Sequence, residues 1–97
     1  MIPKNYEAFQ EFLKGQLPPK NWSLPLQALW YDAKGDWESS HYIAQDIHSP
    51  MGSWIHAYLH RKEGDKWNAQ YWYNRADRPF PDYSLGDELK VLVENNL

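Results

Sequence analysis

The amino-acid sequence predicts an all-α protein of about six helices, arranged as antiparallel helical hairpins with flanking terminal helices. Apolar residues recur at three- and four-residue spacing in several short stretches, which is the period of an amphipathic helix. Polar residues that can cap a helix stand before these stretches, and glycine or proline follows them. No sustained alternation of apolar and polar residues indicates a strand. We therefore expect a single helical domain over residues 1–97.

Each predicted helix follows a residue whose side-chain oxygen can accept a hydrogen bond from a free N–H group of the first turn. The predicted N-caps, in chain order, are Asn5, Ser23, Asp36, Ser53, Asp65 and Ser84. The first five helices are expected to end near Lys14, Gly35, Ile47, Lys62 and Ala76, and the sixth carries Leu85, Leu89, Leu92 and Val93 on one face. Glycine at a helix end is favoured because it adopts the left-handed conformation without steric cost.

These helices divide the chain into three parts. Residues 1–20 hold the N-terminal helix and a stiff proline connector, residues 21–81 hold two helical hairpins, and residues 82–97 hold a C-terminal capping helix. The two hairpins form a weak internal repeat, in which Ala28, Gly35 and Asp36 correspond to Ala57, Gly64 and Asp65. A hairpin of this kind cannot bury its apolar faces alone, so the two are expected to stack.

The second hairpin resembles a known repeat. The positions that match the second half of a tetratricopeptide motif are Gly64, Ala69, Tyr73, Ala76 and Pro81, with Ala57 at the small position of the first helix. The longer tract 54–78 is similar to a group of small bacterial proteins without an assigned activity. The resemblance implies tetratricopeptide-like hairpins, but His56 and His60 stand where that motif has large apolar residues.

Composition narrows the possible functions. The 97 residues include 42% hydrophobic and 24% charged residues, and the net charge is −3. Aromatic residues reach 16%, with 6 Trp, 7 Tyr and 3 Phe, and can build a core that aliphatic residues alone would not supply. The lack of cysteine excludes disulfides, thiolate catalysis and cysteine-based zinc sites. The acidity argues against nucleic acid, and the lack of a long apolar run argues against a membrane. We expect a cytoplasmic protein, and no cofactor is indicated.

The histidines are the main candidates for chemistry. His56, His60 and Glu63 stand at i, i+4 and i+7 of the predicted fourth helix, so they share one face. His41 lies on the preceding helix, which must cross nearby after a short connection. One hypothesis is a metal site formed by His56, His60 and Glu63. The alternative is that the histidines are buried and hydrogen-bonded, which the cost of unpaired polar groups favours.

A ligand pocket between the helices is a related hypothesis, and its candidate residues are His41, Trp54, His56, His60, Trp72 and Arg75. Trp54, Trp72 and Tyr58 could serve as stacking walls or could simply be core residues. Arg61, Arg75 and Asn68 could bind a carboxylate or phosphate, or could form ordinary surface salt bridges.

A third set of residues points to an interface. Trp67 and Tyr71 are four residues apart and lie on a different face of the fifth helix from Ala69 and Ala76. They form an exposed aromatic patch unless the C-terminal helix covers them. The first functional expectation is a small intracellular helical-repeat module that binds a protein partner or itself. The alternative is a protein that binds a small molecule or a metal between its histidines and tryptophans, with hydrolysis as one activity that such a site could have. No motif in the sequence discloses a reaction.

Overall fold

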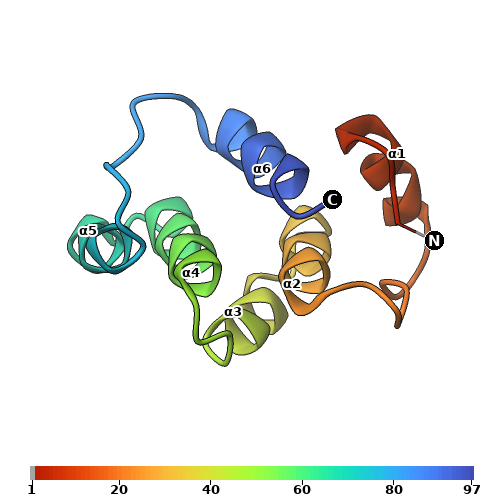
Figure 1. Ribbon diagram of the computed structural model, residues 1–97, viewed down its shortest axis with the longest axis horizontal. Coiled ribbons are helices and arrows are strands. Elements are labelled where there is room, and N and C mark those ends of the chain that lie inside the picture. Colours follow the sequence, from red (N-terminus) through yellow and green to blue (C-terminus); the bar gives the residue numbers. More distant parts are fainter. Residues whose placement is uncertain (1) are drawn as a thin grey trace.

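Six α-helices and one short 3-10 turn make up the secondary structure of residues 2–97, which the computed structural model describes (Figure 1). The elements are α1 (Tyr6–Glu11), η1 (Phe12–Lys14), α2 (Leu24–Ala33), α3 (Trp37–Ala44), α4 (Pro50–Lys62), α5 (Lys66–Arg75) and α6 (Leu85–Glu94). No strand occurs in this part of the chain, so the all-α prediction is confirmed. None of the described helices has the length and apolar character that a membrane crossing requires.

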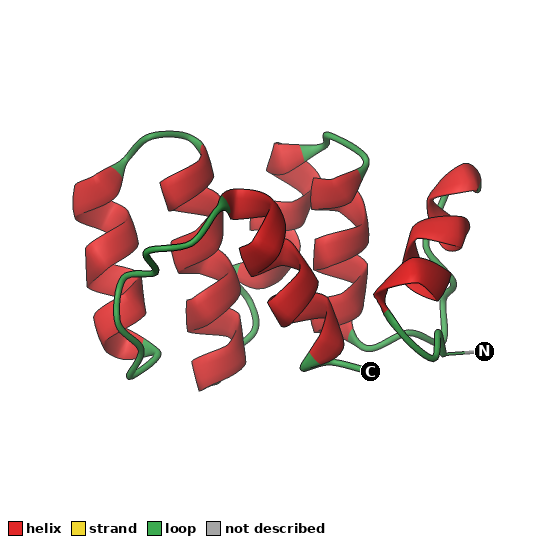
Figure 2. Ribbon diagram, turned by 90° about the horizontal axis from the view of Figure 1, so that it is seen from above, coloured by secondary structure: helices red, strands yellow, loops and turns green. Residues whose placement is uncertain are grey.

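Helices α2 and α3 form one antiparallel hairpin, and α4 and α5 form the second (Figure 2). Gly35 and Gly64, in the turns, have φ angles of 87° and 90°, which confirms their predicted left-handed role. Asp36 and Asp65 follow them and accept hydrogen bonds from backbone N–H groups in the first turns of α3 and α5. The sequence therefore predicted the turns of both hairpins correctly.

The start of α4 differs from the prediction. The helix begins at Pro50 after the N-cap Ser49, one turn before the predicted cap Ser53. Proline is tolerated there because the first N–H groups of a helix have no intrahelical partner. The preceding helix α3 correspondingly ends before Ile47, which packs directly on Gly52. A Cβ atom at Gly52 would lie 1.9 Å from the Ile47 carbonyl oxygen, so this close approach requires glycine.

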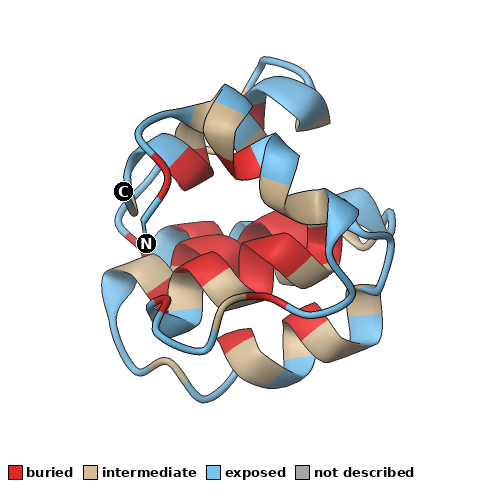
Figure 3. Ribbon diagram, turned by 90° about the vertical axis from the view of Figure 1, so that its right-hand side faces the viewer, coloured by how far each residue is buried: buried red, intermediate tan, exposed pale blue. Residues whose placement is uncertain are grey.

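The core lies where the hairpins meet each other and the two terminal helices. Figure 3 shows that buried positions gather on the inward faces of the helices. Trp30, Tyr58 and Tyr73 are among the largest fully buried side chains, as the aromatic composition led us to expect. Helix α6 packs against α1, α2 and α4, so it covers one side of the hairpins and leaves the outer side of α5 uncovered (Figure 1).

Two buried carboxylates join the helices. Asp32 of α2 accepts a hydrogen bond from the Tyr58 hydroxyl at 2.7 Å and pairs with the Lys62 ammonium at 2.8 Å. Glu88 of α6 accepts from three donors, Trp54 Nε1 at 3.1 Å, Tyr73 Oη at 2.6 Å and Arg61 Nη1 at 2.8 Å. Every buried side-chain nitrogen and oxygen of the described residues has a partner. These carboxylates are therefore structural groups with their bonding capacity in use.

Candidate functional site

Three imidazole rings meet between the two hairpins. His56 and His60 lie one turn apart on α4, and His41 faces both of them from α3. The short connection between α3 and α4 brings the two helices side by side, which sets this meeting of rings. We call His41, His56 and His60 the three-histidine cluster.

The nitrogens of the cluster are close enough to act together. His41 Nε2 and His56 Nε2 are 2.9 Å apart and share a hydrogen bond, in which one ring N–H donates and the other nitrogen accepts. One ring nitrogen from each of His41, His56 and His60 lies within 4.8 Å of the other two. The rings of His56 and His60 also stack, with centroids 4.8 Å apart. The structure thus brings together the three histidines that the sequence nominated for a pocket.

Burial lowers the pKa of two rings of the cluster, His41 and His56. The His56 side chain is almost fully buried, and burial lowers its pKa to about 4, with further lowering by His41 and His60. Burial also lowers the pKa of His41, and His60 adds to this while Glu63 acts in the opposite direction. Neutral imidazoles offer the lone pairs that a metal ion or a proton donor requires.

Indole rings enclose the cluster on two sides. Trp37 stacks on His41 with centroids 4.8 Å apart, and its Nε1 donates to the Leu59 carbonyl oxygen at 2.8 Å. Trp72 stacks on His56 with centroids 4.0 Å apart and an interplanar angle of 16°. The tryptophans restrict the orientation of both imidazoles and keep water from their faces. Trp72 was a predicted pocket residue, whereas Trp37 was not.

Glu63 does not join His56, which corrects the predicted metal set. The carboxylate of Glu63 lies 3.0 Å from His60 Nδ1. Glu63, His60 and Asp65 form a second set of neighbouring ligand atoms, which does not include His56. Positions seven apart on a helix are about 10 Å apart along its axis, so Glu63 cannot reach the imidazole of His56. His41 from α3 takes the place that the sequence interpretation gave to Glu63.

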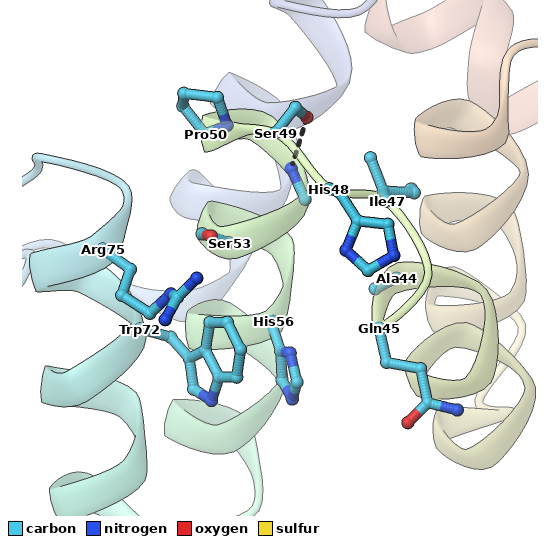
Figure 4. A pocket seen from close by; sticks show the side chains of 11 residues that line it. Ala44, Gln45, Ile47, His48, Ser49, Pro50, Ser53, His56, Trp72 and Arg75 are labelled. Atoms are coloured by element: carbon cyan, nitrogen blue, oxygen red, sulfur yellow. Dashed lines mark hydrogen bonds between the residues drawn. The ribbon is translucent and has the colours of Figure 1, made fainter.

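A cavity of about 500 Å³ borders the cluster, and we call it the His56 cavity (Figure 4). It lies among the end of α3, the loop that follows, the first turns of α4, and α5. Figure 4 shows Gln45 and His48 on one side of it, Trp72 and Arg75 on the other, and His56 between them. The remaining lining residues are Ala44, Ile47, Ser49, Pro50, Gly52 and Ser53.

The predicted pocket residue Trp54 and the candidate anion-binding residues Arg61 and Asn68 lie away from the cavity. Trp54 is bonded to Glu88 and lies under the guanidinium of Arg78, whose Cζ atom is 3.5 Å from the Trp54 ring centroid. Arg61 is also held by Glu88, and Asn68 bonds to the carboxylate that caps α5. Positions two apart on a helix point to nearly opposite sides, at about 200° around its axis, which separates Trp54 from His56 on α4. These side chains therefore serve the helix packing.

The His56 cavity contains residues that the predicted pocket set did not include. Gln45 and His48 lie just before α4, and Ser53, the expected N-cap, lies within the first turns of α4. The tract His48-Ser49-Pro50 was the available signal, because a serine before proline is a good helix start. Histidine in a loop next to such a start can face the same space as the first turns of the helix.

The outer face of α5 carries an exposed aromatic pair. Trp67 is 78% exposed and Tyr71 is 45% exposed, and the two rings stack with centroids 6.5 Å apart. The Arg75 guanidinium continues this row, with Cζ 5.8 Å from the Tyr71 ring centroid. The C-terminal helix does not cover the pair, because α6 packs on other helices. The predicted interface residues thus lie on an accessible surface.

Comparison with known proteins adds no assignment. No protein-family model matches the chain, and no curated protein or solved structure is significantly similar to it. The tetratricopeptide resemblance therefore stays a prediction, and a functional conclusion must be drawn from the geometry of the three-histidine cluster, the His56 cavity and the surface of α5.

Proposed function

We propose that this protein binds a divalent transition-metal ion at the three-histidine cluster and uses it to bind a small molecule in the His56 cavity. The observation that carries the proposal is the convergence of one nitrogen from each of His41, His56 and His60 within 4.8 Å. Imidazole suits zinc, copper, iron and nickel, and three histidines form a known type of zinc site. Zinc is the natural first probe.

The distances support this reading. Zinc binds histidine nitrogen at about 2.0–2.1 Å in a tetrahedral arrangement, so two ligand nitrogens lie about 3.3 Å apart. The nitrogens of His41 and His56 are 2.9 Å apart, close to that spacing. The third nitrogen, from His60, needs a small side-chain adjustment to complete the set. The lowered pKa values of His41 and His56 reduce the proton competition that would oppose metal binding.

Glu63 supplies a supporting contact. Metal-bound histidines usually donate their second ring N–H to a carboxylate, which fixes the tautomer and raises the basicity of the ligand. Glu63 lies 3.0 Å from His60 Nδ1, so Nε2 of His60 remains for the metal. The cluster thus has three ligands, one oriented by a carboxylate and two oriented by stacked indoles.

The three ligands leave a coordination position for water or a bound molecule. Catalytic zinc sites have three protein ligands and an open fourth position, while structural sites are closed by four. His56 belongs both to the cluster and to the lining of a cavity of about 500 Å³, so a molecule in the cavity would lie beside the metal. Metal-dependent binding of a small molecule is therefore the function that the geometry supports best.

Zinc titration of the chelator-treated protein tests the proposal. We expect one zinc ion per chain, measured by calorimetry and by elemental analysis after dialysis. His41→Phe keeps a ring against Trp37 but removes a ligand, so it should lower the affinity by more than about 100-fold. Glu63→Gln removes only the supporting contact to His60 and should lower the affinity by about 10–100-fold.

His48→Phe is the matched control. His48 lines the His56 cavity but lies outside the three-histidine cluster, so this variant should bind zinc as the wild type does. Circular dichroism establishes that each variant is folded. Failure of the wild type to retain zinc, or equal losses in the His41 and His48 variants, would overturn the proposal.

The exposed face of α5 favours a second candidate function, self-association. Stacked hairpins usually end in a helix with a polar outer face. Here α5 ends the row of hairpin helices and exposes Trp67 and Tyr71 instead, with Arg75 beside them. Tryptophan, tyrosine and arginine are the residues that contribute most at interfaces. A second copy of the chain, stacked through the same face, would bury this row symmetrically.

Sedimentation of the wild type and of Trp67→Ser tests self-association. We expect a concentration-dependent dimer that the variant loses, while its unfolding free energy changes by less than about 0.5 kcal/mol, because Trp67 is exposed. Lys66→Ser, one residue earlier, is the control and should leave the dimer unchanged. A wild type that stays monomeric at the highest soluble concentration would rule out this function.

A further inference from the structure

The side chains around the His56 cavity are rich in hydrogen-bond donors and lack acids. Arg75 is its permanently charged residue, and Gln45, His48 and Ser53 provide further N–H and O–H groups. No aspartate or glutamate of residues 2–97 lines the cavity. The local charge therefore favours an anion over a cation or a neutral sugar.

Arg75 is held in position but not neutralised. Its Cζ lies 5.2 Å from the Trp72 ring centroid, and one N–H donates to the Tyr71 hydroxyl at 3.2 Å. The carboxylates that form ion pairs in the described part of the chain are Glu11, Asp32, Glu63 and Glu88, and none of them pairs with Arg75. A guanidinium with free N–H groups can bind a carboxylate with two parallel hydrogen bonds.

His56 connects the cavity to the three-histidine cluster. Its Nε2 faces His41, and its Nδ1 has no hydrogen-bond partner among the described residues. Since every buried side-chain nitrogen in this part of the chain has a partner, Nδ1 is open to solvent, and the space that His56 borders is the cavity. The two nitrogens of one ring thus face two different sites.

Metal binding determines whether His56 Nδ1 is a hydrogen-bond donor or an acceptor. Without a metal, the hydrogen bond to His41 allows two arrangements, and in one of them the proton of His56 is on Nε2 and Nδ1 is an acceptor. A metal on Nε2 permits only the tautomer with the proton on Nδ1, so this atom becomes a donor toward the cavity. The acceptor arrangement, which would repel an anion, is removed.

From these observations, and resting on the metal centre proposed above, we infer that the His56 cavity binds a small organic carboxylate between Arg75 and His56, and that metal at the three-histidine cluster strengthens this binding. The ligand is a metabolite-sized anion, because the cavity holds about 500 Å³. The coupling works in both directions, so a bound carboxylate also raises the affinity for the metal.

Fluorine NMR with para-fluorobenzoate tests the inference, and para-fluorobenzamide, which has the same shape without the charge, is the control ligand. We expect the zinc-loaded protein to bind the benzoate and not the amide. Removal of zinc should weaken benzoate binding by about fivefold or more, the lower end of typical coupling between two sites. Arg75→Gln should weaken it about tenfold.

Lys66→Gln is the matched variant, because it makes the same charge change on α5 away from the cavity and should leave benzoate binding unchanged. If zinc binds the cluster but benzoate binds equally well with and without it, or equally to the Arg75 and Lys66 variants, the inference is wrong and the metal function stands. If zinc does not bind the cluster at all, the proposed function fails, and the inference fails with it.

Discussion

Acid should destabilise this protein before its carboxylates titrate, and His56 sets the effect. Burial and the neighbouring His41 and His60 lower the pKa of His56 from its ordinary value of 6.5 to about 4. The unfolded chain therefore takes up a proton at a higher pH than the folded chain does. The contribution of neutral His56 to the free energy of unfolding is fully present above about pH 6.5. It is lost as the pH falls toward about 4, because protonation favours the unfolded state.

The magnitude follows from that gap. One pKa unit corresponds to 1.36 kcal/mol, so His56 alone lowers the free energy of unfolding by at most about 3 kcal/mol between pH 7 and pH 4. The pKa of His41 is lowered too, which adds to the loss. The groups that face His56 from α3 and α4 are also histidines, and Arg75 of α5 lines the same cavity. Among the described residues, no carboxylate forms a hydrogen bond or ion pair with His56 that would offset the added charge.

Urea denaturation of the chelator-treated protein at several pH values measures this effect, with His56→Phe as the comparison. The variant keeps a ring against Trp72 but cannot take up a proton, so its curve should be flatter by about 1.4 kcal/mol per pH unit below pH 6. NMR titration of the histidine rings provides the site-specific measurement. Parallel curves for wild type and variant, or a His56 resonance that titrates near pH 6.5, would refute the reasoning.

Two further predictions concern the fold. Gly52→Ala should destabilise by about 3 kcal/mol or more because its Cβ would collide with the backbone of Ile47. Gly86→Ala in α6, whose Cβ would lie 4.0 Å from Ser84 Oγ without a clash, should stabilise by up to about 1 kcal/mol; thermal unfolding compares the two. Glu88→Ala leaves the buried donors of Trp54 and Tyr73 without a partner and removes the carboxylate that pairs with Arg61, so it should cost about 3–5 kcal/mol in urea denaturation, whereas the exposed Glu94→Ala should be within about 0.5 kcal/mol of wild type. A small effect at Gly52 or Glu88, similar to that of its control, would contradict the packing described here.

Local signals in the sequence predicted most of the helices. Asn5, Ser23 and Ser84 cap helices where expected, and so do both aspartates of the hairpin turns. The failure at α4 has a clear cause. Ser49 and Ser53 both precede helix-compatible residues, and the choice between them depends on Ile47 packing against Gly52, which is a contact between segments.

The candidate site was predicted in part. Spacing on one helix paired His56 with His60, because side chains four residues apart share a face. The same spacing argument wrongly added Glu63. Spacing does not show that the helix ends here and that this carboxylate contacts His60 and not His56. Trp54 was assigned to the pocket by residue type, and only its bond to Glu88 of α6, far along the chain, shows that it belongs to the packing on the other side of α4.

The sequence by itself determined the all-helical class, the two hairpin turns and most helix starts, because periodicity, caps and left-handed glycines act over a few neighbouring residues. The sequence placed His41 near His56 and His60, and the tertiary structure decided that the three nitrogens meet, that the cavity opens at the start of α4, and that α6 leaves Trp67 uncovered. These features depend on how α3, α4 and α6 cross one another. Helix crossing is set by side-chain packing between distant segments, which no local pattern encodes.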